Sequence, residues 1–313
     1  MKNVFFLALN WDTSDHLAAM TESVEDTVGP VTWLILDNGS TPAEWGKLMD
    51  WAFDRGGRVT ISKKKDIRSI APLALGVAGQ GAVALTVIIR RHENLGMIHG
   101  YNQLLDLALN LSDGEHHDVV LINTDVRVNQ VGWLYDVLEW LKDRPEIGVV
   151  GMEHSRGELC AAAIFLDTVG NWYTQAGQTR QAIPVEGESV GLGFCLVRWP
   201  VLEAGIRFSP EFEFYYKQDD DFTFRIRHEL GLQIWAYPVD CVHLGRASIL
   251  EHDYKVGPAT NQLEFENMKK RNQKRFADRW EWLLRGRRPS LQAEARHLEE
   301  MRAAMGERRG RNV

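Results

Sequence analysis

The sequence predicts an α/β protein with a mostly parallel central sheet and helices on both faces. Short apolar runs, typical of buried strands, alternate with amphipathic helical patterns along the first half of the 313-residue chain. Parallel strands need long crossover connections, and helices in such connections cover both faces of the sheet. Less regular apolar runs at 153–215 predict a small antiparallel addition, and a helical extension rich in Arg and Lys follows from about residue 259.

The first half begins in the order strand, helix, strand, helix. VFFLAL (4–9) predicts a buried strand, and apolar residues at i, i+3 and i+7 predict the helix after it. VTWLIL predicts the second strand, which ends in DNGS. The letters TPAE then predict a helix start, with Thr41 as N-cap, Pro42 as first helical residue and Glu44 closing a capping box.

The remaining elements continue this alternation. AVALTVII (82–89) predicts a strand, and ENLGMIHGYNQ opens a leucine-rich helix after it. DVVLINTDVRV (118–128) predicts a further strand, followed by the amphipathic helix WLYDVLEWL and a strand at 147–152. In such sheets ligands bind at the carboxyl ends of the strands, so the residues that end each strand are the first candidates for a site.

The composition is that of an ordinary globular protein, with 44% hydrophobic residues and a net charge of -7 that disfavours an indiscriminate nucleic-acid binder. Cys160, Cys195 and Cys241 lie far apart, which predicts neither a zinc site nor a disulfide framework and fits a reducing cytosol. The N-terminal apolar run is shorter than the core of a signal peptide. We therefore expect a cytoplasmic protein.

One stretch, 70–89, is about as long as a membrane span and has basic residues on both sides. Pro72, Gln80 and three glycines favour a loop that leads into the buried strand instead. A membrane-spanning helix is the less favoured alternative for this stretch.

The run QDDDFTFR places three carboxylates at the start of a helix predicted from about Asp220 to Leu230. A helix N-terminus favours anions, which accounts for one or two of them. Consecutive residues point about 100° apart around a helix, so the three cannot share one partner. Crowded carboxylates also raise one pKa, which suits a general base.

Two other residues predict a metal site. Asp125 follows the apolar strand of LINTD, and His243 closes the strand of CVH. A carboxylate with an imidazole suits Mn²⁺ or Mg²⁺ held partly by a substrate diphosphate. Taken alone, Asp125 more often caps a turn and His243 is more often structural.

Together these motifs resemble glycosyltransferase family 2, nucleotide-sugar enzymes of the GT-A fold. The resemblance lies in seven motifs in the family's order, over roughly residues 3–248: LALNW, ILDNGST, ENLGMIHGYNQ, NTD, GLGFCLVRWPVLEAGIRFSPEF, QDDDFTFR and CVHLGRAS. It implies a GT-A catalytic domain over 1–255, with a nucleotide-sugar-binding half (1–128) and an acceptor-side half (129–255). Residues 256–313 form the basic helical extension.

The resemblance also implies roles for individual residues. Asp219 falls on the catalytic base and Asp221 on a second acid, with Asp220 beside them as an alternative base, while Arg225 falls on an arginine that braces the acidic run. A metal would lie at Asp125 and His243. The nucleotide-sugar would be bound by Leu9, Asn10, Trp11, Asp37, Asn38, Asn94, Gly96, Asn102 and Thr124, and the acceptor side would contain Gly193, Phe194 and Gln218.

The chain departs from the family pattern at two positions. Gln218 stands where the family has Glu, and Asp220 replaces an apolar residue. The acceptor side is therefore where we expect this protein to differ from its family.

The activity implied is metal-dependent, inverting transfer of a sugar from a nucleoside-diphosphate sugar to a hydroxyl group. UDP-sugars are favoured as donors, and dTDP- and GDP-sugars stay open. The acceptor would be a glycan, a lipid-linked glycan or a hydroxylated nucleic-acid base. The alternatives are a catalytically weak sugar-nucleotide-binding protein and a nucleotidyltransferase, although LALNWDTSDH lacks the glycine-rich phosphate loop that the latter needs.

The extension is strongly basic. Residues 264–313 contain 14 Lys and Arg against 8 Asp and Glu. The favoured interpretation is a solvated helical extension or a contact between copies of the chain in a homo-oligomer. The alternative is a basic arm that contacts an anionic acceptor, nucleic acid or a membrane surface, where the protein would then be peripheral.

Overall fold

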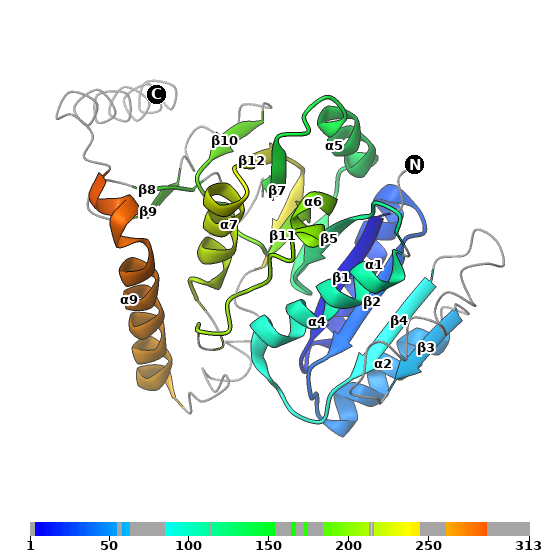
Figure 1. The fold of residues 1–313 in the computed structure, drawn as a ribbon. Coiled ribbons are helices and arrows are strands. Elements are labelled where there is room, and N and C mark those ends of the chain that lie inside the picture. Colours follow the sequence, from blue (N-terminus) through cyan, green and yellow to red (C-terminus); the bar gives the residue numbers. More distant parts are fainter. Residues whose placement is uncertain are drawn as a thin grey trace, which may run out of the picture.

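The computed structural model shows an α/β fold in which one central sheet lies between two layers of helices (Figure 1). It describes residues 4–54, 58–62, 85–112, 114–153, 164–166, 172–174, 184–212, 214, 216–244 and 261–286. The expected loop at 70–84, most of the basic extension and Cys160 lie outside these ranges.

Within the described residues, nine strands form the central sheet in the order β10-β12-β7-β11-β5-β1-β2-β4-β3. Strands β5, β1, β2, β4 and β3 pair in parallel, as do β12 and β7. Strand β11 is antiparallel to both β5 and β7, and β10 is antiparallel to β12. The predicted mostly parallel sheet with a small antiparallel addition is confirmed. The strands are β1 (Val4–Asn10), β2 (Thr32–Asp37), β3 (Arg58–Ser62), β4 (Leu85–Arg90), β5 (Asp118–Ile122), β7 (Ile147–Glu153), β10 (Val185–Gly187), β11 (Phe194–Val197) and β12 (Gln233–Pro238).

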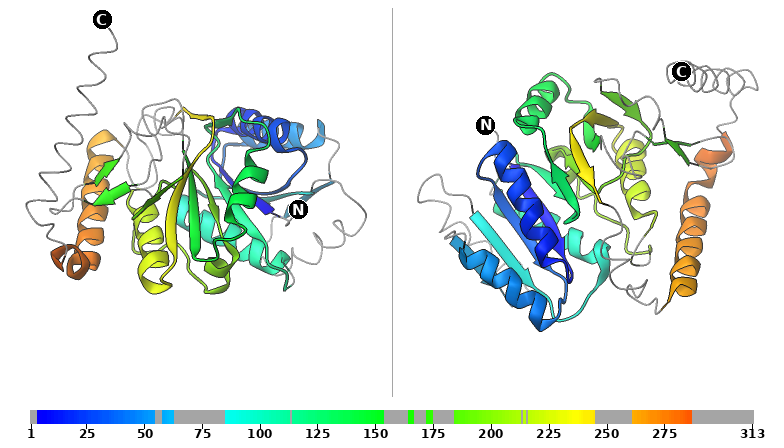
Figure 2. Two further views of the ribbon diagram at one scale, coloured as in Figure 1. Left: turned by 90° about the horizontal axis from the view of Figure 1, so that it is seen from above. Right: turned by 180° about the vertical axis from the view of Figure 1, so that it is seen from behind.

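The helices cover both faces of the sheet, as predicted. One core cluster joins the sheet to α1, α2 and α5, which lie in front in the view from behind in Figure 2. The other joins the opposite face to α4, α6, α7 and α9. The helices are α1 (Ser14–Val28), α2 (Pro42–Asp54), α4 (Gly96–Leu111), α5 (Trp133–Leu141), α6 (Trp199–Glu203), α7 (Gln218–Glu229) and α9 (Gln262–Gly286).

Strand β1 shows why the central strands consist of continuous apolar runs. Successive side chains of a strand point to opposite faces. Phe6 therefore packs in the cluster of α1, α2 and α5, whereas Phe5 and Leu7 pack in the cluster of α4 and α7. Because both faces are covered by helices, every position of the strand favours an apolar residue.

The predicted start of α2 is partly right. Helix α2 begins at Pro42, and the N–H of Glu44 donates to Oγ1 of Thr41 at 3.4 Å, so Thr41 is the N-cap. The reciprocal half of the capping box was wrong. The backbone N–H of Thr41 donates instead to Asp12 at 2.7 Å, and Glu44 accepts from the N–H of Ser14 at 3.1 Å. The N–H of Ser14, which has no partner within the first turn of α1, binds the Glu44 carboxylate in place of the N–H of Thr41.

The strand predicted at 118–128 is broken in two. Strand β5 ends at Ile122, and β6 (Val126–Val128) leaves the main sheet to pair antiparallel with β13 (Cys241–His243). A hairpin of β8 (Ile164–Leu166) and β9 (Trp172–Thr174) forms a further small sheet. The break falls at the polar residues of NTD (123–125). The predicted site residues therefore lie in the bend between two strands.

Helix α9 is not solvated all round, contrary to the favoured interpretation. Phe276 and Trp280 are 3% and 4% exposed and form edge-to-face contacts with Phe224 of α7. No described helix is long and apolar enough to cross a membrane. The division into a domain over 1–255 and an extension over 256–313 stays a prediction.

Candidate active site

The carboxyl ends of β1 and β2 form a polar cluster at the edge of the sheet. Asn10 and Asp37 are paired in the parallel register and both are fully buried. Asn10 Nδ2 donates to Asp37 Oδ1 at 3.0 Å and to Ser40 Oγ at 3.3 Å. Burial raises the pKa of Asp37, while Ser40, Asn10 and Arg90 act in the opposite direction. Asp37 Oδ2 has no hydrogen-bond partner among the described residues, and Arg90 Nε is 4.0 Å from it.

The amides of Asn38 and Asn94 join two loops beside this cluster, the one that follows β2 and the one that precedes α4. Asn38 Nδ2 donates to Asn94 Oδ1 at 2.8 Å, and Asn38 Oδ1 accepts from the N–H of Leu95 at 3.2 Å. Gly39 lies so close to the second loop that a Cβ at this position would be 2.5 Å from the carbonyl carbon of Glu93. These asparagines therefore hold the loops that frame Asp37.

Two of the residues that were expected to bind the nucleotide-sugar, Asn102 and Gly96, contact the acceptor-side half. Asn102 accepts from the N–H of Phe208 at 2.8 Å and donates to its carbonyl at 2.9 Å, so its amide is engaged with that backbone. Gly96 has φ of +82°, and a Cβ there would be 3.1 Å from the ring of Phe214. Both residues of α4 thus position the loop before α7. Leu9 and Trp11 remain partly exposed at the end of β1.

The ribbon of β6 and β13 brings Asp125 and His243 together, as the metal prediction required. His243 is paired with Val126 in the register, and its Nε2 lies 2.9 Å from Asp125 Oδ1. The N–H of Leu244 donates to the Asp125 carbonyl at 2.9 Å. Thr124, just before, contacts Thr13 at 3.2 Å between hydroxyl oxygens, which links the pair to the end of β1.

The donor set of this pair fits a divalent cation. One carboxylate oxygen and one imidazole nitrogen are ligands that Mn²⁺ accepts. The described part of the chain contains no cluster of three or more His, Cys, Asp or Glu that could hold a metal. A cation at Asp125 and His243 would therefore need further ligands from a substrate or from water.

The three aspartates of the acidic run point to different partners. Helix α7 begins at Gln218, two residues earlier than predicted, so all three lie in its first turn. Asp220 accepts from Lys217 Nζ at 2.9 Å and from Ser189 Oγ at 3.2 Å. Asp221 accepts from Arg279 and Trp280 of α9. The prediction that the three could not share a partner is confirmed.

Asp219 is the member of the run with an unpaired oxygen. The carboxylate is partly buried, and its Oδ1 is enclosed without a hydrogen-bond partner among the described residues. Burial and the charge of Asp220 raise the pKa of Asp219 to about 7. The backbone N–H of Leu192, the charge of Lys217 and the amide of Gln218 lower it and offset part of this rise. A carboxyl group that titrates near neutral pH suits a general base.

Residues 192–193 connect Asp219 to the Asp125–His243 pair. The N–H of Leu192 hydrogen-bonds the Asp219 carboxylate. Gly193, the next residue, lies against the imidazole, since a Cβ there would be 3.1 Å from His243 Cε1. The charges of Asp219 and Asp125 both raise the pKa of the buried Tyr101, which places that phenol near both acids. The candidate base and the candidate metal ligands therefore belong to one site.

The other two acceptor-side residues are buried. Gln218 is 2% exposed, and its Oε1 has no hydrogen-bond partner within the described structure. Its Nε2 lies 3.7 Å from the sulfur of Met97. The side chain of Phe194 points away from the acidic run. Phe194 is the first residue of β11, and the strand's alternation directs its ring into the core against Trp133, with 5.0 Å between ring centroids.

Arg279 braces the acidic run through hydrogen bonds to Asp221 that the sequence did not indicate. Burial raises the pKa of Asp221, and the charge of Arg225, like that of Arg279, acts to lower it. Arg225, expected in that role, forms hydrogen bonds with the carboxylate of Glu229 and the carbonyl of Arg207. Asp221 and Arg279 are 58 residues apart. The apolar spacing of Phe276 and Trp280 on a basic helix was the one available signal that α9 packs on the domain.

The sheet order, the two helix layers and the acidic edge define a glycosyltransferase fold of the GT-A type. The fold is similar to that of the mannosyltransferase PcManGT from Pyrobaculum calidifontis, solved in complex with GDP-Man and Mn²⁺. That similarity covers 97% of this chain and 81% of the mannosyltransferase chain, with 13% sequence identity and a TM-score of 0.52.

A second similar structure is TarS 1-349 from S. aureus, which matches 76% of this chain at 12% identity with a TM-score of 0.45. This chain spans 60% of the TarS chain. No family model matches the chain, and no curated protein matches it.

Proposed function

We propose that this protein is an inverting glycosyltransferase that moves a sugar from a nucleoside-diphosphate sugar to a hydroxyl acceptor. The observation that carries the proposal is the convergence of two groups on residues 192–193. Asp219 has an unpaired carboxylate oxygen and a pKa near neutrality, and the Asp125–His243 pair lies next to it across Gly193. The GT-A fold supports the same conclusion, because the similar mannosyltransferase was solved with a nucleotide-sugar and Mn²⁺.

In the proposed reaction, Asp219 accepts the proton of the acceptor hydroxyl. The hydroxyl oxygen forms a bond to the anomeric carbon of the donor sugar, and the bond from that carbon to the diphosphate oxygen breaks on the opposite side. The electron pair of the broken bond leaves with the nucleoside diphosphate. A single displacement of this kind inverts the anomeric configuration.

Asp125 and His243 would hold a divalent cation, Mn²⁺ or Mg²⁺. Such a cation supplies a positive charge that offsets the negative charge on the departing diphosphate. Thr124, which precedes Asp125, ties this part of the site to the end of β1. The nucleotide would therefore lie between Asp125 and the cluster of Asn10 and Asp37.

Asp37 is the residue we assign to the nucleoside. Its Oδ1 is held by Asn10, whereas Oδ2 is buried without a hydrogen-bond partner in the described structure. An N–H of the base or a hydroxyl of the ribose would satisfy that oxygen. UDP-sugars remain the favoured donors, and GDP-sugars gain support from the ligand of the similar mannosyltransferase. Turnover would take place in the cytoplasm.

The acceptor would bind at the start of α7, beside Asp219. Gln218 is a neutral amide at the position where the family has a Glu carboxylate. The acceptor would therefore lie near one carboxylate, that of Asp219, rather than two. The acceptor class stays within glycans, lipid-linked glycans and hydroxylated nucleic-acid bases.

The test is a panel of UDP-, dTDP- and GDP-sugars, each measured by thermal shift and by release of nucleoside diphosphate, with Mn²⁺, Mg²⁺ or EDTA. We expect one donor class to raise Tm and to be turned over only with a divalent cation. Asp219→Asn should bind that donor and transfer no sugar, and NMR of the wild-type product should show an inverted anomeric centre. Failure of every donor to bind, or full transfer by Asp219→Asn, would reject the proposal.

A further inference from the structure

Helix α9 contacts the acidic run through two consecutive residues. Arg279 Nη1 donates to Asp221 Oδ1 and Oδ2 at 3.2 and 3.1 Å, and Trp280 Nε1 donates to Asp221 Oδ1 at 3.0 Å. Asp221 is fully buried, so its carboxylate depends on these donors for the hydrogen bonds that water would otherwise supply. The first turn of α7 is thus attached to a helix from a distant part of the sequence.

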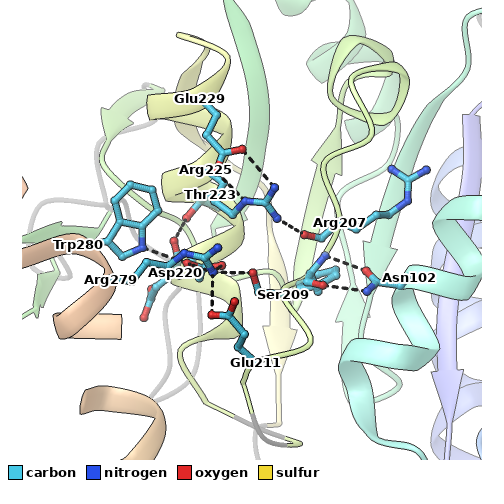
Figure 3. A network of polar contacts seen from close by, with 12 residues as sticks. Asn102, Arg207, Ser209, Glu211, Asp220, Thr223, Arg225, Glu229, Arg279 and Trp280 are labelled. Carbon is cyan, nitrogen blue, oxygen red and sulfur yellow. Dashed lines mark hydrogen bonds and ion pairs between the residues drawn. The ribbon is translucent and has the colours of Figure 1, made fainter. Parts of the chain in front are cut away.

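The same arginine also holds the loop that leads into α7. Arg279 Nη1 donates to Ser209 Oγ at 2.6 Å and lies 3.7 Å from Glu211 Oε2 (Figure 3). This guanidinium group therefore connects the helix turn at Asp221 with the segment before it. Removing the group would weaken its contacts with both Asp221 and Ser209.

The loop is fixed at its other end by α4 and by α7 itself. Phe208 exchanges two backbone hydrogen bonds with the amide of Asn102. Its ring stacks on Phe222 with centroids 4.5 Å apart and planes at 14°. Arg225 donates to the carbonyl of Arg207 at 2.8 Å. Of these contacts of the loop, those of Arg279 with Ser209 and Asp221 lie nearest to the acidic run.

Between these anchors and the candidate base, the backbone takes an unfavourable conformation. Phe214, Tyr216 and Lys217 have φ of 34°, 83° and 71°, in the left-handed region that non-glycine residues rarely adopt. Lys217 immediately precedes the first helical residue, Gln218. Strained residues of this kind persist only where the surrounding contacts hold them. Asp219 follows this turn directly, as the second residue of α7.

Trp280 is tightly packed between α9 and α7. It is 4% exposed and contacts the rings of Phe224 and His228 at 5.3 and 5.7 Å between centroids. Phe276, one turn earlier, contacts Phe224 at 5.3 Å. Helix α9 is therefore packed on α7 by apolar contacts that are independent of the Asp221 hydrogen bonds.

We infer that Arg279 and Trp280 are positioning residues for Asp219, which act through Asp221 and Ser209 to fix the orientation of the first turn of α7. The inference rests on the proposed function, since it assigns Asp219 as the base. Asp219 is two residues from Asp221 in the same turn, so a shift of that turn moves the base. Misplacement of a catalytic group by about 1 Å can lower a rate by about 100-fold.

The experiment compares variants of the full chain with a control on the same helix. Arg279→Met removes the guanidinium and keeps an apolar stem, and Trp280→Phe removes the N–H together with the five-membered ring of the indole and keeps an aromatic side chain. The control is Lys274→Met, because Lys274 is 75% exposed and pairs with Asp278. For each variant we would measure kcat and donor Kd. Amide hydrogen exchange at residues 217–222 provides a readout that does not depend on activity.

We expect Arg279→Met to lower kcat by about 10- to 100-fold with donor Kd unchanged, to speed exchange at 217–222, and to be partly rescued by Arg279→Lys. Trp280→Phe should show the same changes to a smaller extent, and Lys274→Met none. If Arg279→Met does not fold, Arg279→Met with Asp221→Asn removes both charges and replaces it in the comparison.

Wild-type kcat with unchanged exchange in a folded Arg279 variant would overturn the inference, as would a fall in kcat matched by an equal rise in donor Kd. A wild-type protein that turns over no donor would instead reject the proposed function. In that case unchanged exchange in Arg279→Met would still reject the attachment of the turn, and faster exchange would support it.

Discussion

Gly193 lies against the imidazole of His243, so closely that a Cβ at residue 193 would be 3.1 Å from His243 Cε1 and 3.1 Å from Asn123 Nδ2. The residue before it, Leu192, donates its N–H to the Asp219 carboxylate. One peptide segment thus separates the candidate metal ligand from the candidate base. A change at Gly193 should affect the metal side of the site before it affects the base.

We therefore expect Gly193→Ala to weaken divalent-cation binding. A methyl group at 3.1 Å forces the imidazole of His243 to move by a few tenths of an ångström. The Mn²⁺ concentration for half-maximal activity should rise several-fold, with little change in Tm. Gly46→Ala is the control, because no atom lies within 4 Å of a Cβ there. Equal Mn²⁺ dependence in the two variants would show that the contact is irrelevant.

The pH dependence of transfer should report the titration of Asp219. A base must be deprotonated to act, and the pKa of Asp219 is raised to about 7 by burial and by Asp220. We expect kcat/KM to rise tenfold per pH unit below about pH 7 and to level off above it. Asp220 and Lys217 act on this charge from α7 and its N-cap, and Tyr101 and Cys195 face it from α4 and β11. An acid limb near pH 4 would contradict the assignment.

Asp219→Asn should stabilise the fold at pH 8 while it abolishes transfer. The folded-state pKa of Asp219 lies above its unfolded value, so the folded state binds more protons between about pH 4 and 7, and the free energy of unfolding falls as pH rises through that window. The amide removes this cost, which we put at about 1–2 kcal/mol for a partly exposed group. Thermal unfolding at pH 4 and pH 8 measures it.

The matched comparison is Asp220→Asn, which should destabilise at pH 8. Asp220 pairs with the buried Lys217, whose ammonium would lose its carboxylate partner. Removing one member of a buried pair leaves an uncompensated charge. A variant of Asp219 that lost stability like that of Asp220 would indicate a structural ion pair at Asp219 and would contradict the base assignment.

Gly96→Ala should cost more stability than backbone strain alone explains. Gly96 and Gly132 have similar φ, +82° and +78°, but a Cβ at Gly96 would be 3.1 Å from the Phe214 ring and one at Gly132 meets no atom within 4 Å. Gly132→Ala should cost about 1 kcal/mol in the free energy of unfolding. Denaturant unfolding of both variants isolates the Phe214 contact, and equal losses would argue against it.

The order of strands and helices could be predicted because each of those elements has a recognisable pattern of residues within its own segment of the sequence. Buried strands such as VFFLAL appear as apolar runs, and the start of α2 is encoded in four consecutive letters. The second half of the capping box was wrong because Glu44 is captured by the N–H of Ser14, which lies 30 residues away. Local patterns do not contain such competition between elements.

The candidate site residues could be chosen from the same local patterns. Asp125, His243 and Asp219 are candidates because each ends a predicted strand or begins a predicted helix, and because their order along the chain resembles a family pattern. The contacts of Asn102 and the burial of the Phe194 ring were not predictable, since sequence order does not reveal whether an amide is used by a neighbouring backbone or which face a short strand buries. Arg279 was missed because its partner is remote in sequence.

The contact between Asp221 and Arg279 also gives an order to events during synthesis. A chain leaves the ribosome from its N-terminus, so the strands and α7 become available before α9. The counter-charge of Asp221 arrives 58 residues after it. A nascent chain stalled before residue 279 would therefore hold an assembled donor half and an unfinished first turn of α7, and the ability to transfer sugar would be acquired late in translation.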